Sequence, residues 1–128
     1  MTVEEMSERI VEFVAHRSGA SFPEIIGELG PEAEGDLQWS IAPNTILWVG
    51  LSEKFVKAFQ LAKPIVRPHP ADPLVYLMDG AALQLPIAKR IRKEGYKREH
   101  WFPVVFNLSD EEKARRRKSR KSSRTDPL

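Results

Sequence analysis

The chain of 128 residues is 41% hydrophobic and contains no cysteine, which excludes a disulfide scaffold, thiol catalysis and thiolate metal sites. No apolar run approaches the roughly 18 residues needed to cross a bilayer, and the acidic start of the chain lacks the pattern of a secretory signal. We therefore expect a cytoplasmic protein that has one domain with a modest core, followed by a tail.

The net charge of +2 conceals a strong segregation along the chain. Residues 1–51 hold two basic groups against nine acidic ones, whereas residues 52–98 hold ten basic and four acidic groups. After a short acidic stretch, residues 113–128 hold eight basic groups against one acidic group. This distribution indicates that part of the folded body, together with the tail, is suited to meeting a polyanion.

Two helices are predicted at the start of the chain. Residues 3–16 place apolar side chains at helical spacing, and Thr2 is suited to be the N-cap. Residues 21–29 form a shorter helix, because Ser21 and Glu24 have the spacing of a capping box. A glycine and a proline directly after residue 29 end this second helix.

A strand and a third helix are predicted next. Residues 30–43 have the composition of a loop. Apolar residues alternate within this stretch, so a short strand is an alternative prediction. Thr45–Val49 is apolar and rich in β-formers, which predicts a buried strand. Residues 52–62 form a helix with an apolar back and a mostly cationic front, with Ser52 as its N-cap and Pro64 at its end.

The middle of the chain is expected to form β-structure, because four prolines exclude a long helix there. Ile65-Val66 and Leu74–Met78 are strand-like, and a rigid turn at residues 69–73 separates them. Asp79-Gly80 is a hairpin signal, and Ala82–Ile87 is the predicted return strand.

The end of the chain is predicted to hold one more strand and a polar tail. Residues 88–95 form a short helix or a loop, and the apolar run Trp101–Leu108 predicts a strand near a sheet edge because it contains a proline. Ser109 and the acids after it are a good helix start, so a helix to about Lys118 is one interpretation. Because residues 109–128 contain almost no large apolar side chains, we expect disorder or at most a fraying helix.

Three helices followed by a β-hairpin resemble the winged-helix branch of the helix-turn-helix family, over roughly residues 3–87. The resemblance implies that the helix at 52–62 is the recognition helix. It also implies that the turn at 69–73, or the one at Asp79-Gly80, is the wing.

The implied fold class is α+β and winged-helix-like, with three helices, a β-hairpin and an additional strand. Residues 1–108 form this domain, and residues 109–128 form the disordered basic tail. The chain departs from the family in one respect, because the link between the second and third helices has about 22 residues where the family has three or four.

The resemblance also implies a nucleic-acid interface on the third helix. Lys54, Lys57 and Gln60 face base edges or phosphates in this prediction, and Lys63 and Arg67 flank them. The charge map agrees, because the first two helices are acidic whereas the third helix and the residues after it are basic. The same arrangement also serves protein contacts, so the fold alone does not settle the function.

Two further basic segments are candidate phosphate contacts. Residues 89–98 carry six basic side chains around Tyr96, which suits phosphate contacts and a stacking ring; the alternative is a solvated connector. The tail adds salt-sensitive affinity for nucleic acid, or binds an acidic protein surface, or keeps the protein in solution. The predicted contacts in the two segments are Lys89, Arg90, Arg92, Lys93, Lys97, Arg98, Arg115, Arg116, Arg117 and Lys118.

The sequence contains no catalytic constellation. His16, His69 and His100 are far apart and lack metal-binding spacing, and no glycine-rich phosphate loop is present. We therefore expect no enzymatic activity, no cofactor and no metal. The predicted function is that of a small DNA-binding regulator of transcription. RNA is an alternative ligand, and a protein-interaction module that uses Trp101–Leu108 or the acidic helices is the alternative class.

Overall fold

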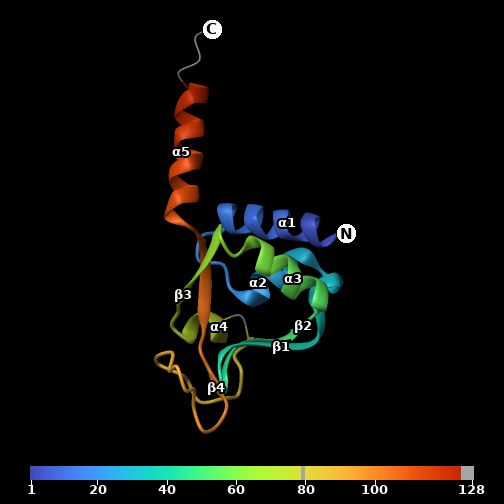
Figure 1. The fold of residues 1–128 in the computed structure, drawn as a ribbon, viewed down its shortest axis with the longest axis vertical. Helices are drawn as coiled ribbons and strands as arrows, with labels where there is room; N and C mark the ends of the chain where they lie inside the picture. The colour runs from blue at the N-terminus through green and yellow to red at the C-terminus, as the bar shows by residue number, and fades with distance from the viewer. Residues whose placement is uncertain (79, 125–128) are drawn as a thin grey trace.

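The computed structural model describes residues 1–78 and 80–124, with side-chain environments as far as Ser119. Its fold is α+β, and Figure 1 shows α1, α2 and α3 close together, with the strands beside and below them and α5 projecting from the body. The helices are α1 (Val3–His16), α2 (Phe22–Leu29), the 3-10 turn η1 (Pro31–Ala33), α3 (Glu53–Ala62), α4 (Leu74–Met78) and α5 (Asp110–Arg124). The strands are β1 (Glu34–Ala42), β2 (Thr45–Leu51), β3 (Val66–Pro70), β4 (His100–Trp101) and β5 (Val104–Leu108).

The first three helices lie where the sequence predicts them, because side chains cap their first turns. Thr2 accepts a hydrogen bond from the backbone N–H of Glu5 (3.1 Å), and Ser21 accepts one from the N–H of Glu24 (3.4 Å). Each glutamate carboxylate in turn accepts from the backbone of its N-cap residue, which completes two capping boxes. Ser52 caps α3 in the predicted way, with a hydrogen bond of 3.0 Å.

A narrow sheet joins the early part of the chain to its end. β3 pairs antiparallel with β5, and Ala20 forms a bridge with Phe106 on the other side of β5. Because Phe106 exchanges both of its backbone hydrogen bonds with Ala20, it makes none with Pro68, its neighbour in β3. Pro68 and Pro70 therefore turn their ring nitrogens to the outer edge, where proline prevents a further strand from pairing.

A second sheet has the order β1-β2-β4, with β4 parallel to β2. β1 and β2 form a hairpin that turns at Pro43 and Asn44. Asn44 has a φ of 55°, a left-handed conformation that asparagine tolerates better than most residues. The stretch 30–43, expected to be mainly a loop, is thus mainly the strand β1. The alternating apolar residues that make a short strand possible lie within β1, whose side chains are exposed apart from the partly buried Trp39 and Ala42.

The predicted strand at Leu74–Met78 is wrong, because this stretch forms the short helix α4. The Asp72 carboxylate accepts a hydrogen bond of 2.9 Å from the first backbone N–H of α4, and Pro73 precedes the helix. Tyr76 is fully buried, and its hydroxyl donates to the carbonyl of Val104 (2.6 Å). Local capping and burial of one ring therefore outweigh the β-propensity of the run.

The return strand predicted at Ala82–Ile87 is also wrong, apart from a single bridge between Ile87 and Trp101. Residue 79 of the predicted hairpin turn lies outside the described residues. Residues 88–95 form a loop, which is one of the two conformations expected for them. The strand predicted at Trp101–Leu108 divides into β4 and β5.

The tail begins as a helix. The composition of residues 109–128 predicts disorder or at most a fraying helix, whereas α5 covers Asp110–Arg124, beyond the predicted end at Lys118. Its first turn is capped by Ser109, whose hydroxyl accepts from the N–H of Glu112 (3.2 Å). Residues 125–128 lie outside the described part of the chain.

An aromatic cluster forms the centre of the core. Phe22 is fully buried and lies at the middle of this cluster. The rings with centroids 5.0–6.4 Å from that of Phe22 belong to Trp39, Trp48, Phe55, Phe59 and Phe106. Trp101 is buried as well, so the apolar run at 101–108 supplies core side chains. One cluster of rings thus joins α2, β1, β2, α3 and β5.

Candidate functional site

The segment 89–98, which we call the basic loop, is a dense group of exposed positive charge. Its basic residues are all exposed, and none forms an ion pair with another described residue. They are Lys89, Arg90, Arg92, Lys93, Lys97 and Arg98. Glu94 is the one acidic residue of the segment. Clustered cations without an ion-pair partner among the described residues are the electrostatic feature that a phosphate backbone attracts.

The basic loop is fastened to the turn of the β1–β2 hairpin. The N–H of Tyr96 donates to the carbonyl of Pro43 (3.2 Å), and Asn44 Nδ2 donates to the carbonyl of Tyr96 (2.8 Å). Gly95 permits this close approach, because an added Cβ would lie 2.7 Å from Cβ of Pro43 and closer still to its carbonyl oxygen. Gly95 also has a φ of 77°, which favours glycine. The loop is therefore held in one position on the body.

Tyr96 stiffens the basic loop through internal contacts. Its ring stacks on His100, with centroids 4.1 Å apart and an interplanar angle of 20°, and the Arg92 guanidinium carbon lies 4.7 Å from the ring centroid. The Tyr96 hydroxyl donates to the carbonyl of Arg90 (2.7 Å). The stacking ring that the sequence predicts for a nucleic-acid base is thus already in contact with two side chains. Phosphate contact by the loop's cations is the part of that prediction that the geometry favours.

The cationic face of α3 is largely engaged within the molecule. Lys54 Nζ donates to the Glu32 carboxylate (2.9 Å) and to the carbonyl of Met1 (2.6 Å). Hydrogen bonds from Lys54 and from the N-terminal ammonium lower the pKa of the Glu32 carboxyl. Lys57 pairs with Glu53 one turn earlier (2.9 Å). A nucleic acid that approached these lysines would compete with acidic groups of the protein itself.

The other two residues predicted for this helix also differ in availability. Lys63 follows α3, and its ammonium lies 5.9 Å from the centroid of the Trp39 ring, a cation–π contact with the neighbouring strand β1. Gln60 is exposed, and its side chain has no hydrogen-bond partner among the described residues. Of the five residues in the predicted recognition set, Gln60 and the solvent-exposed Lys57 are the best placed to meet a ligand from α3.

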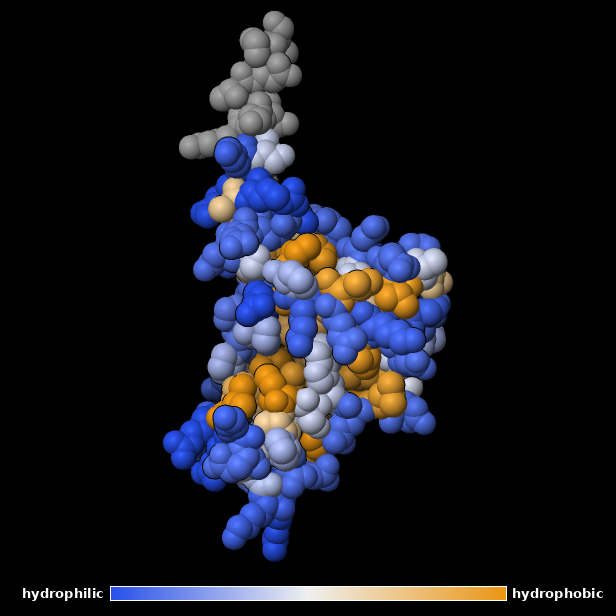
Figure 2. Space-filling model, in the orientation of Figure 1, coloured by the Kyte–Doolittle hydropathy of each residue, from blue (hydrophilic) through white to orange (hydrophobic). Residues whose placement is uncertain are grey.

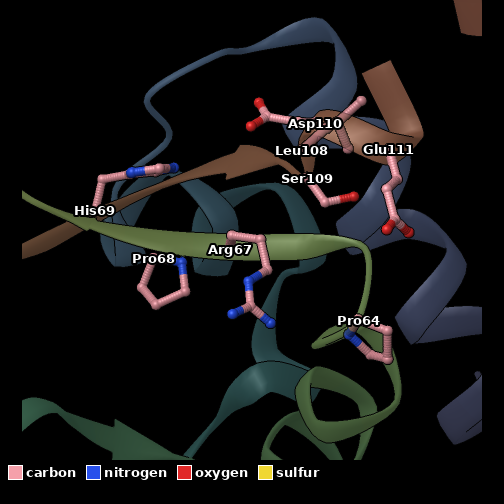
Figure 3. Close-up of a pocket in the computed structure, with 8 residues that line it drawn as sticks. All are labelled: Pro64, Arg67, Pro68, His69, Leu108, Ser109, Asp110 and Glu111. Atoms are coloured by element: carbon pink, nitrogen blue, oxygen red, sulfur yellow. The ribbon is translucent and has the colours of Figure 1, made fainter. Parts of the chain in front are cut away.

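Arg67 lies apart from α3, on the exposed edge strand β3. It lines an open hollow of about 650 Å³ between β3 and the start of α5. Figure 3 shows the Arg67 side chain pointing away from Asp110 and Glu111, which stand on the α5 side of the hollow. A phosphate placed there would meet charges of both signs, so this hollow is a poor anion site.

The base of α5 is fastened to α1 through a buried carboxylate. Glu112 accepts hydrogen bonds from Arg115 (2.6 Å) and Arg116 (2.8 Å), and Arg116 also donates to Glu12 of α1 (2.8 Å). The Arg115 hydrogen bond, supported by Arg116, lowers the pKa of Glu112 to about 2. Arg115 and Arg116, two of the four predicted tail contacts, are therefore engaged with carboxylates of the protein itself. The exposed cations of α5 that form no ion pair with a described residue are Lys113, Arg117 and Lys118.

Acid is expected to loosen α5. Because the folded pKa of Glu112, about 2, lies below the ordinary value of 4.5, the carboxylate stabilises the docked helix fully above pH 4.5. This contribution is lost as the pH falls from 4.5 through about 2. Far-UV circular dichroism should show a loss of helix in that window. At pH 7, Glu112→Gln should expose α5 to faster trypsin cleavage.

A neighbouring acid provides the control for this experiment. Glu111 stands on the same turn, is exposed, and makes no hydrogen bond or ion pair with a described residue. Glu111→Gln should leave both the helix signal and the cleavage rate at pH 7 unchanged. Equal effects of Glu111→Gln and Glu112→Gln would show that the carboxylate network does not hold α5.

The fold groups the predicted contacts by segment and does not gather them on one surface. The six cations of the basic loop lie together, whereas Lys54 and Lys63 contact η1 and β1 and Lys57 pairs with Glu53 on α3 itself. Figure 1 places the basic loop and α5 at opposite ends of the long axis, with α3 between them. The basic loop, α3 and α5 therefore form three separate basic regions.

Comparisons with known proteins find no relative. Neither protein-family models nor curated proteins nor solved structures match this chain. Among residues 1–78 and 80–124, no group of three or more His, Cys, Asp or Glu side chains is arranged to hold a metal ion. No helix in the same residues is long and apolar enough to cross a membrane.

Three residues that position the basic loop are absent from the sequence candidates. Pro43, Asn44 and Gly95 carry no charge, and Gly95 lies far from the other two in the chain. A local signal exists at both places, because Pro-Asn between apolar stretches favours a turn and a glycine inside a charged run favours an unusual φ. Nothing in the sequence indicates that these two places meet.

Proposed function

We propose that this chain is a nucleic-acid-binding protein, with duplex DNA as the expected ligand and the basic loop as the principal contact. The observation that carries the proposal is a fixed loop of six exposed cations that form no ion pair with a described residue. Such cations release counterions from a phosphate backbone without first breaking a salt bridge. Because Gly95 and Tyr96 already hold the loop, binding also costs little conformational entropy.

A winged-helix arrangement is part of this proposal. What supports it is that β3 and β5 form an antiparallel pair after the three helices, with residues 71–103 connecting the two strands. That connection takes the place of the wing and contains the basic loop, whereas the predicted turn at 69–73 is only its start. The long link before α3 holds η1, β1 and β2, which explains its length. A wing that contacts the phosphate backbone suits these charges.

In this arrangement α3 has a secondary part. Lys57 and Gln60 add contacts to phosphates or base edges, and Lys54 contributes mainly to the stability of the protein through Glu32. Binding should therefore depend strongly on salt and only slightly on base sequence. A regulator of transcription that recognised a defined site would need more from α3 than these two side chains supply.

Neutralising the basic loop tests the proposal directly. The loop variant carries Lys89→Gln, Arg90→Gln, Lys93→Gln and Lys97→Gln, and keeps Arg92 because that side chain contacts Tyr96. Its dissociation constant for a labelled DNA duplex at low salt, measured by fluorescence anisotropy, should rise about 10- to 100-fold. The α3 variant, Lys57→Gln with Gln60→Ala, should raise it about threefold or less.

The comparison of affinities requires that the loop variant is folded like the wild type. All four changes of the loop variant fall on exposed residues, so its thermal unfolding midpoint should match that of the wild type. If the wild type fails to bind at low salt, or if the loop variant binds as tightly as the wild type, the proposed function is wrong. An RNA duplex in the same assay separates DNA preference from general phosphate binding.

A protein-interaction module is a second candidate function, and the surface of α4 favours it. Leu74, Leu77 and Met78 are 60%, 56% and 87% exposed. Figure 2 shows several separate apolar patches on one face, and one of them, at the lower left, lies where Figure 1 places α4. The docking strand considered from sequence, 101–108, is mostly buried and unsuited to this role. A stoichiometric partner that is captured from nuclease-treated lysate by the wild type, and not by the double variant Leu77→Ser with Met78→Ser, would favour this candidate.

A further inference from the structure

The molecule has a second cationic surface, remote from the basic loop. α5 projects from the upper end of the body in Figure 1, and the basic loop lies at the lower end. On α5, the exposed Lys113, Arg117 and Lys118 form no ion pair with a described residue. The sequence of the helix adds three more basic residues, Arg120, Lys121 and Arg124.

Acidic groups flank the path between the two cationic surfaces. In Figure 1, β3 and β5 run between the basic loop and the base of α5, and α1 and α2 lie to one side of them. Residues 1–51, which contain these two helices, hold nine acidic groups against two basic ones. Glu4, Glu8 and Glu28 are among the exposed acids of these helices. A duplex laid along the helical side of the body would pass within the roughly 8–10 Å over which these acids repel it at moderate salt. A duplex laid along β3 would meet the exposed Asp110 and Glu111 at the base of α5. One duplex is thus poorly suited to contact both surfaces.

Both cationic surfaces are also held in place. Arg116 connects Glu112 at the base of α5 to Glu12 of α1, so the helix is fixed where it leaves the body. The contacts of Gly95 and Asn44 hold the basic loop on the β1–β2 turn. Neither surface is able to turn toward the other without breaking these contacts.

We propose that one molecule bridges two nucleic-acid segments, with the basic loop on one duplex and α5 on a second. The inference rests on the proposed function, because the loop's contact with a duplex is its starting point. Like charges repel along free α5, for instance between Lys113 and Arg117 one turn apart, and neighbouring phosphates relieve that repulsion. Neither surface is arranged to read bases, so bridging depends on salt and hardly on sequence.

A capture assay with two duplexes tests the bridging. A biotinylated duplex on beads is given a limiting amount of protein, washed, and then offered a fluorescent duplex, whose retention is measured. The α5 variant carries Lys113→Gln, Arg117→Gln, Lys118→Gln and Lys121→Gln, and leaves the arginines that bind Glu112 in place. The wild type should retain the second duplex. The loop variant and the α5 variant should each retain about tenfold less, because each keeps only one of the two surfaces.

The outcomes separate this inference from the proposed function. Bridging is overturned if the wild type binds the immobilised duplex but retains no second one. It is equally overturned if the α5 variant bridges as well as the wild type, which is the result expected when copies associate and each holds one duplex by its loop. Failure of the proposed function looks different, because the α5 variant, which keeps the basic loop as its cationic surface, then fails to bind a single duplex in the anisotropy assay.

Discussion

Replacing Phe22 by alanine should lower the free energy of unfolding by about 3–5 kcal/mol, the largest effect expected of a single substitution in this chain. The ring is fully buried, and five aromatic rings lie around it at centroid distances of 5.0–6.4 Å. Its removal leaves a cavity where α2, the hairpin, α3 and β5 meet, and rigid rings close such a cavity poorly. Urea unfolding followed by tryptophan fluorescence measures the effect.

The same change at Phe13 is the matched control. Phe13 lies on α1 and is only partly buried at the edge of the core, so Phe13→Ala should cost about 1–2 kcal/mol. Phe22→Leu, which keeps most of the volume, should fall between the two alanine variants. Equal destabilisation by Phe22→Ala and Phe13→Ala would contradict the central place of Phe22 in the fold.

Replacing Gly95 by alanine should release the basic loop from the body. A Cβ at this position overlaps Pro43, and the φ of 77° costs a non-glycine residue about 1–2 kcal/mol by itself. The loop then moves off the β1–β2 turn and breaks the hydrogen bonds that Tyr96 shares with Pro43 and Asn44. Hydrogen exchange at residues 95–100 should become faster, and affinity for a duplex should fall because the cations no longer have a fixed arrangement.

Gly19 separates the two causes of this effect. Its φ is also 77°, but a Cβ added there meets no atom within 4 Å. Gly19→Ala therefore carries the backbone penalty alone. Gly95→Ala should lower the free energy of unfolding by about 1–2 kcal/mol more than Gly19→Ala, and only Gly95→Ala should weaken binding. If the two variants have the same stability and affinity, the close contact with Pro43 does not hold the loop.

Much of the helical part of the fold follows from local signals. Thr2, Ser21 and Ser52 are placed so that each side chain bonds the third backbone N–H after it, and these caps fix where α1, α2 and α3 begin. The α+β class is confirmed by the helices and the two sheets of the structure. The three-helix order and the strand at 45–49 could likewise be predicted, because apolar periodicity and capping act within a few residues.

The errors occur where distant contacts decide the conformation. The run Leu74–Met78 has strand-like residues but is helical. One cause is distant, because Tyr76 packs in the core beside Trp101, and the other is local, because Asp72 caps the helix. The pairing of β4 with β2 joins residues more than 50 positions apart, for which no local pattern exists. A capping signal at Asp72-Pro73 is present in the sequence, and it favours a helix as well as a turn.

The sequence predicts the charges of the candidate site but does not predict its geometry. The six cations at 89–98 are evident from the sequence, since a charged run needs no partner to be recognised. Their fixed position is not, because it depends on the contact between Gly95 and Pro43. The same limit applies to Lys54, whose pairing with Glu32 joins residues 22 positions apart.

The salt dependence of duplex binding tests the central claim, that the basic loop contacts phosphates, most directly. The affinities of the wild type and the loop variant for the same DNA duplex are measured over a range of salt concentrations. The slope of log affinity against log salt should become shallower in the loop variant by about 0.9 for each phosphate that the variant no longer neutralises. In the α3 variant, which loses one lysine, the slope should change by no more than the value for one phosphate, about 0.9. An identical slope for the wild type and the loop variant would contradict the claim.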